Sequence, residues 1–238
     1  MSVWDLILGF LIFLPASIVA AALGFGGGLL AIPFLVLINP DFAPVPMVLI
    51  GPFFSGLIAW RERTAINVSA LFRTVLGLIP GVLAGAMVLA TVNKETLGVI
   101  ISLLLLAVIG LTATHVELKP TSKTLLVGGI LSGFMANTVG MPGIAPALTM
   151  SHFKGPTLRS TLNTCVVMIT TVSAGVLAFT NQIHGVHLVA APVLLTAAIF
   201  GFLLREPLRH LVDRRGATQF IHGIAALGSL ALLIRSLT

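Results

Sequence analysis

The sequence predicts an all-α membrane protein that crosses the bilayer several times and contains two helices broken at glycines. Three observations lead to this fold class. Of the 238 residues, 57% are hydrophobic and only 8% are charged, about a third of the charged share of an average soluble domain. Most apolar residues fall in long uninterrupted segments, and two short apolar segments follow glycine-rich breaks. This composition excludes a disordered chain, and a single cysteine, Cys165, excludes a disulfide scaffold.

Eight apolar segments are long enough, or nearly so, to cross a bilayer, which takes about 20 residues. They cover residues 5–23, 42–60, 70–91, 96–114, 124–139, 160–180, 187–204 and 218–236. Two short segments, 29–38 and 144–152, follow the breaks at Gly24–Gly28 and Gly140–Gly143. At a rise of about 1.5 Å per residue, each short segment reaches only about half of the hydrocarbon core.

The basic residues distinguish two ways of threading the chain through the membrane. If the chain crossed the membrane eight times without turning back, seven basic residues would lie on one side and six on the other. Such an even distribution indicates no orientation. If the chain instead turns back at each glycine break, ten segments result, and eleven of the 13 basic residues share one side. These eleven are Arg61, Arg63, Arg73, Lys119, Lys123, Lys154, Arg159, Arg205, Arg209, Arg214 and Arg215, which leaves Lys94 and Arg235 on the other side.

The positive-inside rule therefore favours ten segments, with cytoplasmic loops at 61–69, 115–123, 153–159 and 205–217 and with both termini outside. The same rule explains the net charge of +6. No basic run carries interleaved aromatic residues, so we expect no nucleic-acid partner.

The two halves of the sequence resemble each other at a nearly constant shift. The matches are Gly24 with Gly140, Gly27 with Gly143, and residues 56–60 with residues 175–179. We therefore predict two repeats of about five helical segments, 1–114 and 124–238, joined by a cytoplasmic linker at 115–123. An odd number of segments per repeat inserts the second copy upside down. Inverted repeats with interrupted helices are typical of transporters whose site lies near the membrane midplane.

The two glycine breaks are the candidate binding site for an anion. Glycines form helices poorly, and a helix that begins at a break has unpaired amides at the positive end of its dipole. Such an end binds anions when it lines a protein cavity. The alternative is that small residues let helices cross closely. The candidate residues are Gly26, Gly27 and Gly28 in the first break and Gly140, Pro142 and Gly143 in the second.

Several polar residues at membrane depth are candidate partners for the same anion. Asn137 precedes the second break, and Thr161, Asn163 and Thr164 lie in the segment that follows Arg159. Polar side chains are costly in a bilayer and need a partner, which is either the substrate or a neighbouring helix. Arg159, at the cytoplasmic entrance, would raise the local anion concentration or would serve only as a topology charge.

Other chemistries find little support in the sequence. No Asp or Glu lies deep in an apolar segment, which argues against a proton relay and against paired-carboxylate catalysis. No nucleophile–base pair is visible, so we expect no enzyme activity. His184 and His187 lack a second ligand pair, so we expect no metal and no cofactor. An inside-negative potential drives an anion outward by about 2.3 kcal/mol per charge per 100 mV, and this favours export.

The glycine-rich break followed by Pro33, its counterpart at Gly140–Pro146, and the run Arg159–Thr164 resemble the TauE/SafE family of sulfite and organosulfonate exporters. The resemblance covers essentially the whole chain, although Met141 and Pro142 stand where the family has glycines. It implies a multi-pass permease of the inner (plasma) membrane for small sulfur-containing anions or related carboxylates.

From the residues and the resemblance together, we expect a transporter in the lipid bilayer that moves a small anion outward, either sulfite or an organosulfonate. Two alternatives remain open at this point. The chain could take up an organic anion, or it could be a non-transporting membrane subunit. The sequence does not decide whether the protein forms a homo-oligomer.

Overall fold

The protein is built from helices, as its sequence predicts. A computed structural model describes residues 1–24, 26–113, 118–212 and 217–237, and in these ranges it contains ten α-helices, two short 3-10 turns and no strand. The first five helices are α1 (Val3–Leu23), α2 (Gly27–Ile38), α3 (Val45–Arg61), α4 (Val68–Thr91) and α5 (Lys94–Ala113). The other five are α6 (Ser122–Thr138), α7 (Ile144–Thr149), α8 (Gly155–Phe179), α9 (Gly185–Val212) and α10 (Ala217–Leu237). The 3-10 turns are Pro40–Phe42 and Arg63–Ala65.

Six helices of the described chain are long and apolar enough to cross a membrane, which confirms the prediction of a multi-pass membrane protein. Their outer faces carry large exposed apolar side chains. On α4, for example, Phe72, Ile79 and Met87 are all more than half exposed. In a bilayer such side chains face lipid, where exposure has no hydrophobic cost.

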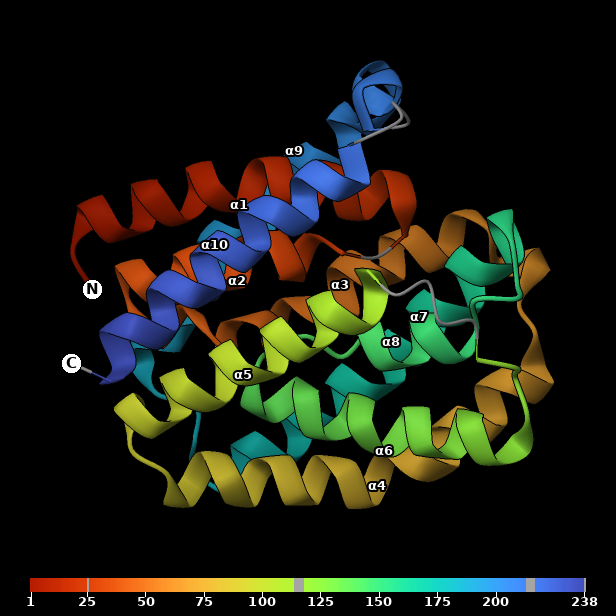
Figure 1. Ribbon diagram of the computed structural model, residues 1–238, viewed down its shortest axis with the longest axis horizontal. Helices are drawn as coiled ribbons and strands as arrows, with labels where there is room; N and C mark the ends of the chain where they lie inside the picture. Colours follow the sequence, from red (N-terminus) through yellow and green to blue (C-terminus); the bar gives the residue numbers. More distant parts are fainter. Residues whose placement is uncertain (25, 114–117, 213–216, 238) are drawn as a thin grey trace.

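The chain turns back at both glycine breaks, as the ten-segment threading predicts. The Asn39 Nδ2 after α2 donates to the Asp5 carboxylate near the start of α1, at 3.1 Å, so these two helices form a hairpin. In the second hairpin, the Ser132 hydroxyl on α6 donates to the Pro142 carbonyl ahead of α7. Figure 1 shows both α2 and α7 running back beside the helix that precedes them. With six residues α7 is only about 9 Å long, shorter than the predicted segment.

Two of the predicted loops overlap helices, one at its end and the other at its start. Helix α8 starts at Gly155 with a proline in its first turn, a favoured starting pattern, so Arg159 lies in a helix and not in a loop over 153–159. Helix α9 continues to Val212, because its residues remain helix-compatible beyond the apolar stretch, and this shortens the loop predicted over 205–217. Residues 115–117 of the predicted linker, residues 213–216 of this loop and Thr238 lie outside the described residues.

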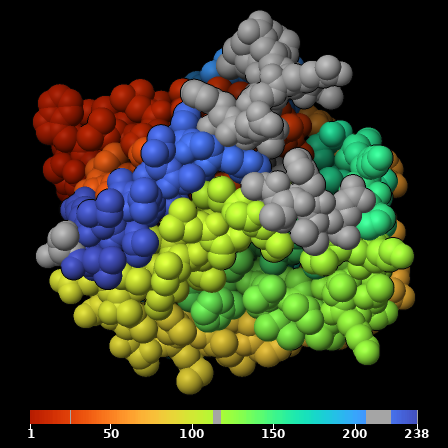
Figure 2. Space-filling model, in the orientation of Figure 1, coloured from red at the N-terminus to blue at the C-terminus, as the bar shows by residue number. Residues whose placement is uncertain are grey.

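The contacts between helices follow a repeating pattern. Helix α1 packs on α9 as α6 packs on α4, and α3 contacts α9 as α8 contacts α4. Helix α3 packs on α8, and α5 packs along α10. Figure 1 shows the ribbons of α5 and α10 side by side, and Figure 2 shows their atoms in contact on this face. The start of α1 and the end of α10 lie at the same end of the molecule, whereas α6 starts at the opposite end (Figure 1). The insertion of the halves in opposite senses across a membrane remains a prediction.

The buried apolar side chains form two clusters. One joins α2, α5 and α9 through residues such as Leu35 and Leu105. The other joins α3, α4 and α8 through residues such as Val82 and Ile169. Helix α3 contributes residues to both clusters, such as Met47 to the first and Val48 to the second, so it joins them.

Helices α4 and α6 touch through their backbones. A Cβ atom added at Gly129 of α6 would overlap the carbonyl oxygen of Thr74 on α4, and one added at Gly81 of α4 would overlap the carbonyl oxygen of Ile130 on α6. Small residues permit this close approach, which is a main source of attraction between helices in membranes.

We expect Gly129→Ala to destabilise the protein by about 1–3 kcal/mol, because the added methyl group has no space without a backbone shift. The measurement is the unfolding temperature of the purified protein in detergent. Gly110→Ala on α5 is the control, because no atom lies within 4 Å of the added carbon. Equal unfolding temperatures for the two variants would contradict the close contact between α4 and α6.

Candidate functional site

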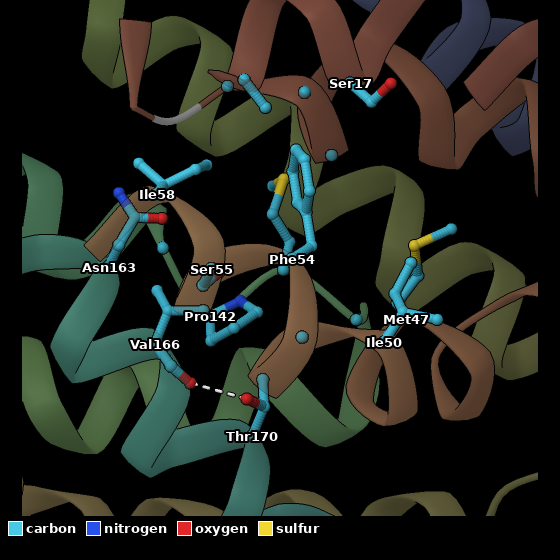
Figure 3. Close-up of a pocket in the computed structure, with 18 of the residues that line it drawn as sticks. Ser17, Met47, Ile50, Phe54, Ser55, Ile58, Pro142, Asn163, Val166 and Thr170 are labelled. Carbon is cyan, nitrogen blue, oxygen red and sulfur yellow. Dashed lines mark hydrogen bonds between the residues drawn. The ribbon is translucent and has the colours of Figure 1, made fainter. Parts of the chain in front are cut away.

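A cavity of about 110 Å³ lies between the two glycine breaks, against α1, α3 and α8 (Figure 3). It is somewhat smaller than an engineered cavity of about 150 Å³ that binds benzene, so it fits a solute of a few non-hydrogen atoms. None of the described residues that line it is charged. Seven predicted site residues are in its wall: Gly26, Gly27, Gly28, Gly140, Pro142, Gly143 and Asn163.

The first break presents unpaired amides to this cavity. Gly24 ends α1 and Gly26 precedes α2, with φ angles of 90° and 92° that favour glycine. The first bond within α2 runs from the Leu30 amide to the Gly26 carbonyl at 3.4 Å, and no side chain caps the helix. The amides of Gly27 and Gly28 therefore have no partner within α2, and they lie at the positive end of its dipole.

The second break repeats this device only in part. Gly140 has a φ angle of 82°, and its amide donates to the Met135 carbonyl at 2.9 Å. The Met141 amide donates to the same carbonyl at 3.2 Å. Pro142 has no N–H to offer. The tight turn after α6 thus occupies the amides of Gly140 and Met141. The Gly143 amide has no partner within α7, whose first bond runs from the Ala147 amide to the Gly143 carbonyl at 3.1 Å.

The glycines of the breaks differ in the space around them. A Cβ at Gly27 would lie 2.5 Å from the Ala16 carbonyl oxygen, so this glycine allows α2 to lie directly on α1. A Cβ at Gly28 would lie 3.0 Å from the Met141 side chain, which shows that the two breaks meet. At Gly143 the nearest atom would be 3.6 Å away, so a side chain there would extend into the cavity without a backbone clash.

Asn163 ties α8 to the first break. Its Nδ2 donates to the carbonyl of Gly24 at 2.9 Å and to the carbonyl of Arg159 at 2.8 Å. The first of these bonds crosses from α8 to the end of α1 and satisfies a carbonyl that the break would leave unpaired. The predicted role of Asn163 at the site is thus combined with a structural one.

Part of the cavity wall comes from α3, which the sequence analysis did not include. Its lining residues are Met47, Ile50, Gly51, Phe54, Ser55 and Ile58. Ser55 is only 6% exposed, and no hydrogen bond among the described residues includes its hydroxyl. Ser17 on α1 also lines the cavity, but its hydroxyl is bonded to the Leu14 and Ala197 carbonyls. A lone serine in the apolar stretch of α3 was the available signal in the sequence.

Three predicted site residues lie away from the cavity. Asn137 on α6 donates from Nδ2 to the Val82 carbonyl on α4, at 2.9 Å. Thr161 accepts a bond from the Asn67 amide at 2.8 Å, and the Thr164 hydroxyl donates to a carbonyl one turn earlier in α8. These side chains satisfy backbone groups within and between helices, which is the alternative role considered for them in the sequence analysis.

Arg159 lies beside the cavity wall, and its charge is paired. Its guanidinium contacts the Glu62 carboxylate at 2.7 Å and 3.0 Å. A Cβ at Gly24 would lie 2.5 Å from the Arg159 side chain, so the arginine stem covers the end of α1. The pairing reduces the ability of Arg159 to attract an anion, and it bridges α8 to the end of α3.

Neighbouring charges extend this ion pair into a cluster. Arg61 contacts Glu62 at 2.9 Å and Glu206 at 3.5 Å, and Arg205 contacts Glu206 at 3.3 Å. Arg61, Arg159 and Arg205 also line a small recess with Ala21 and Ala22 of α1. The cluster links α3, α8 and α9 at the end of the molecule where the sequence predicts the cytoplasm.

Glu62 is ionised in this cluster at neutral pH. Burial alone would raise the pKa of Glu62, but hydrogen bonds from Arg159 and Arg61 outweigh it and hold the pKa below its ordinary value of 4.5. Because the pKa is depressed in the folded state, the stabilisation from Glu62 is present above pH 4.5 and is lost as the pH falls through the folded-state value.

We expect Glu62→Gln to lower the free energy of unfolding at neutral pH by about 1 kcal/mol, a typical size for a partly exposed ion pair. The difference from the unmodified protein should vanish in acid, because both then carry a neutral side chain. Thermal unfolding in detergent from about pH 7 to about pH 3 measures this. The control is Glu206→Gln, whose side chain is 61% exposed and should contribute less. A pH-independent difference would contradict the proposed pairing.

Comparison with known proteins agrees with this picture. The family model of the sulfite exporter TauE/SafE matches residues 8–232, nearly the whole chain. No curated protein and no solved structure matches the chain. A multi-pass helical protein with a small central cavity between two helix breaks has the architecture that a transporter needs. The match over nearly its full length shows that this chain belongs to the sulfite exporter TauE/SafE family of membrane transporters.

Proposed function

We propose that the protein exports sulfite or a small organosulfonate across the inner membrane by binding it in the cavity between the two breaks. One observation carries the proposal. The cavity brings the unpaired amides at the start of α2 together with Ser55 of α3 and Asn163 of α8. Each of these groups comes from a different helix, and α3 and α8 cross at this position.

Neutral donors can hold an anion without trapping it. The N-terminus of a helix carries roughly half a positive charge, and its amides replace part of the water that the anion loses on entering. No charged side chain is among the described lining residues, so the anion would not be bound by a full countercharge. A transport site needs this balance, because the substrate must leave as well as enter.

The size of the cavity supports a small substrate. A volume of about 110 Å³ suits sulfite or a sulfonate with a short carbon chain better than a large organic anion. The description of the matching family names sulfite, a small sulfur-containing oxyanion, and this fits the space available.

Export follows from the charge of the substrate. An inside-negative potential favours outward movement of an anion by about 2.3 kcal/mol per charge per 100 mV. The described cavity wall holds no carboxylate that would bind a coupling cation. We propose that the potential and the substrate gradient drive transport, and that the protein performs no catalytic step.

The test is flux in proteoliposomes of known protein orientation at a set membrane potential. We expect radiolabelled sulfite or a short sulfonate to leave through the protein, faster when the source compartment is negative. Inward-only movement of an organic anion would instead favour an uptake permease. The absence of flux for sulfite, sulfonates and carboxylates would contradict the proposal and favour a non-transporting subunit.

A larger side chain at Gly143 would block the cavity between the two breaks. We expect Gly143→Leu to reduce flux to the background of protein-free vesicles, because the leucine side chain would fill the cavity while the φ angle of −77° accepts any residue. The control is Gly175→Leu on α8, where no atom lies within 4 Å of an added carbon. Both variants should insert in the membrane in equal amounts. Normal flux through the Gly143→Leu variant would exclude this cavity as the pathway.

A further inference from the structure

The orientation of the Asn163 amide is fixed by its bonds. The NH₂ group has two N–H bonds, and the carbonyls of Gly24 and Arg159 each accept one. If the oxygen and nitrogen exchanged places, the amide oxygen would face two carbonyl oxygens, which is unfavourable. The geometry therefore leaves Oδ1 as the free end of this side chain.

The free oxygen of Asn163 faces the cavity. Asn163 is only 3% exposed, and its Oδ1 accepts no hydrogen bond from any described residue. Figure 3 shows this oxygen directed toward the other lining residues, with the nitrogen turned away. An amide oxygen can only accept hydrogen bonds, so this part of the wall needs a donor.

Ser55 supplies a second unpartnered group in the same cavity. Its hydroxyl can donate or accept, and no described residue bonds to it. The cavity thus presents donors at the amides of α2, an adaptable hydroxyl on α3 and a pure acceptor on α8. A ligand that carries only acceptor oxygens would satisfy the first two and would place a negative oxygen against Asn163.

We infer that the preferred ligand is an anion that also carries a hydrogen-bond donor, and that Asn163 Oδ1 selects it by accepting that hydrogen. Hydrogensulfite fits this description, as does a short sulfonate with a hydroxyl group, whereas the fully ionised sulfite dianion does not. This inference rests on the proposed function, because it assigns a substrate class to the same cavity.

The expected selectivity comes from the free-energy cost of leaving the buried Asn163 Oδ1 without a hydrogen-bond donor. A buried polar group left without its partner loses the hydrogen bonds it had with water, and sites built to bond a hydroxyl reject analogues that lack it. We expect a preference of about tenfold or more for the ligand with the donor.

A matched pair of ligands tests this without any change to the protein. The probes are 2-hydroxyethanesulfonate and 1-propanesulfonate, which have the same charge and number of non-hydrogen atoms and differ by a hydroxyl in place of a methyl group. Binding to the purified full-length protein is measured by calorimetry, and flux is measured in proteoliposomes. We expect the hydroxyl compound to bind about tenfold tighter or better.

A pH series with sulfite gives an independent readout. Flux at constant total sulfite should fall as the pH rises through the ionisation of hydrogensulfite, while flux of 2-hydroxyethanesulfonate should stay constant over the same range. Equal affinity for the two sulfonates, or a preference for the fully ionised sulfite, would overturn the inference but leave the proposed function in place. Failure of sulfite and both sulfonates to bind would overturn both.

Variants of the protein test whether Asn163 is the residue that discriminates between the two sulfonates. In Asn163→Leu we expect the ratio of the two sulfonate affinities to fall toward one, even if both affinities drop. Ser55→Ala should keep most of the preference, because the acceptor remains. Thr171→Val is the control on the same helix, because its exposed hydroxyl is bonded to the Val167 carbonyl, and it should leave the ratio unchanged. An unchanged ratio in Asn163→Leu would contradict the assigned role.

Discussion

A peptide group inside a membrane must find a hydrogen-bond partner in the protein, and this constraint determines how the two breaks are built. Each break leaves backbone groups at the end of one helix and at the start of the next without partners inside those helices. At the first break, Asn163 satisfies the Gly24 carbonyl from outside the hairpin, while Gly27 and Gly28 line the cavity and their amides have no partner within α2. At the second break, the chain satisfies itself by folding the Gly140 amide back onto Met135. The open amides thus lie where a solute can reach them.

The two halves therefore show corresponding helix contacts and differ in chemistry. Their helices pack in corresponding pairs, and both hairpins meet at the crossing of α3 and α8. The first hairpin contributes the amides of Gly27 and Gly28 to the cavity wall, whereas the amides of Gly140 and Met141 in the second hairpin are bonded within their own turn. Asn163, from α8, completes the first break from the other half of the chain, so the site depends on the docking of both halves.

Much of the fold could be predicted from the sequence, because hydrophobic length and glycine position act locally. The ten helices and the two reversals follow from apolar segments, glycines and the distribution of basic residues. The glycines of the site could be found in the same way, since a run such as Gly26–Gly28 seldom forms a helix interior.

The remaining wall of the cavity could not be predicted, because it depends on how helices rotate against each other. The apolar residues of α3 that line it, such as Ile50 and Phe54, look like residues that face lipid. Asn137 and Thr161 are polar residues within apolar segments, but their side chains form hydrogen bonds with backbone groups of neighbouring elements. The partner of Arg159 lies 97 positions earlier in the chain, and only the docking of α8 on α3 brings it close.

The direct contact of Gly27 with the Ala16 carbonyl has a mechanical consequence. Gly27 lets the backbone of α2 pack directly against α1 at this point, so a displacement of one hairpin arm is transmitted to the other. If α1 tilted within the bundle, the start of α2 would tilt with it as part of the same rigid unit. A rocking movement of the first hairpin would thus turn its open amides as a single unit between the two faces of the membrane.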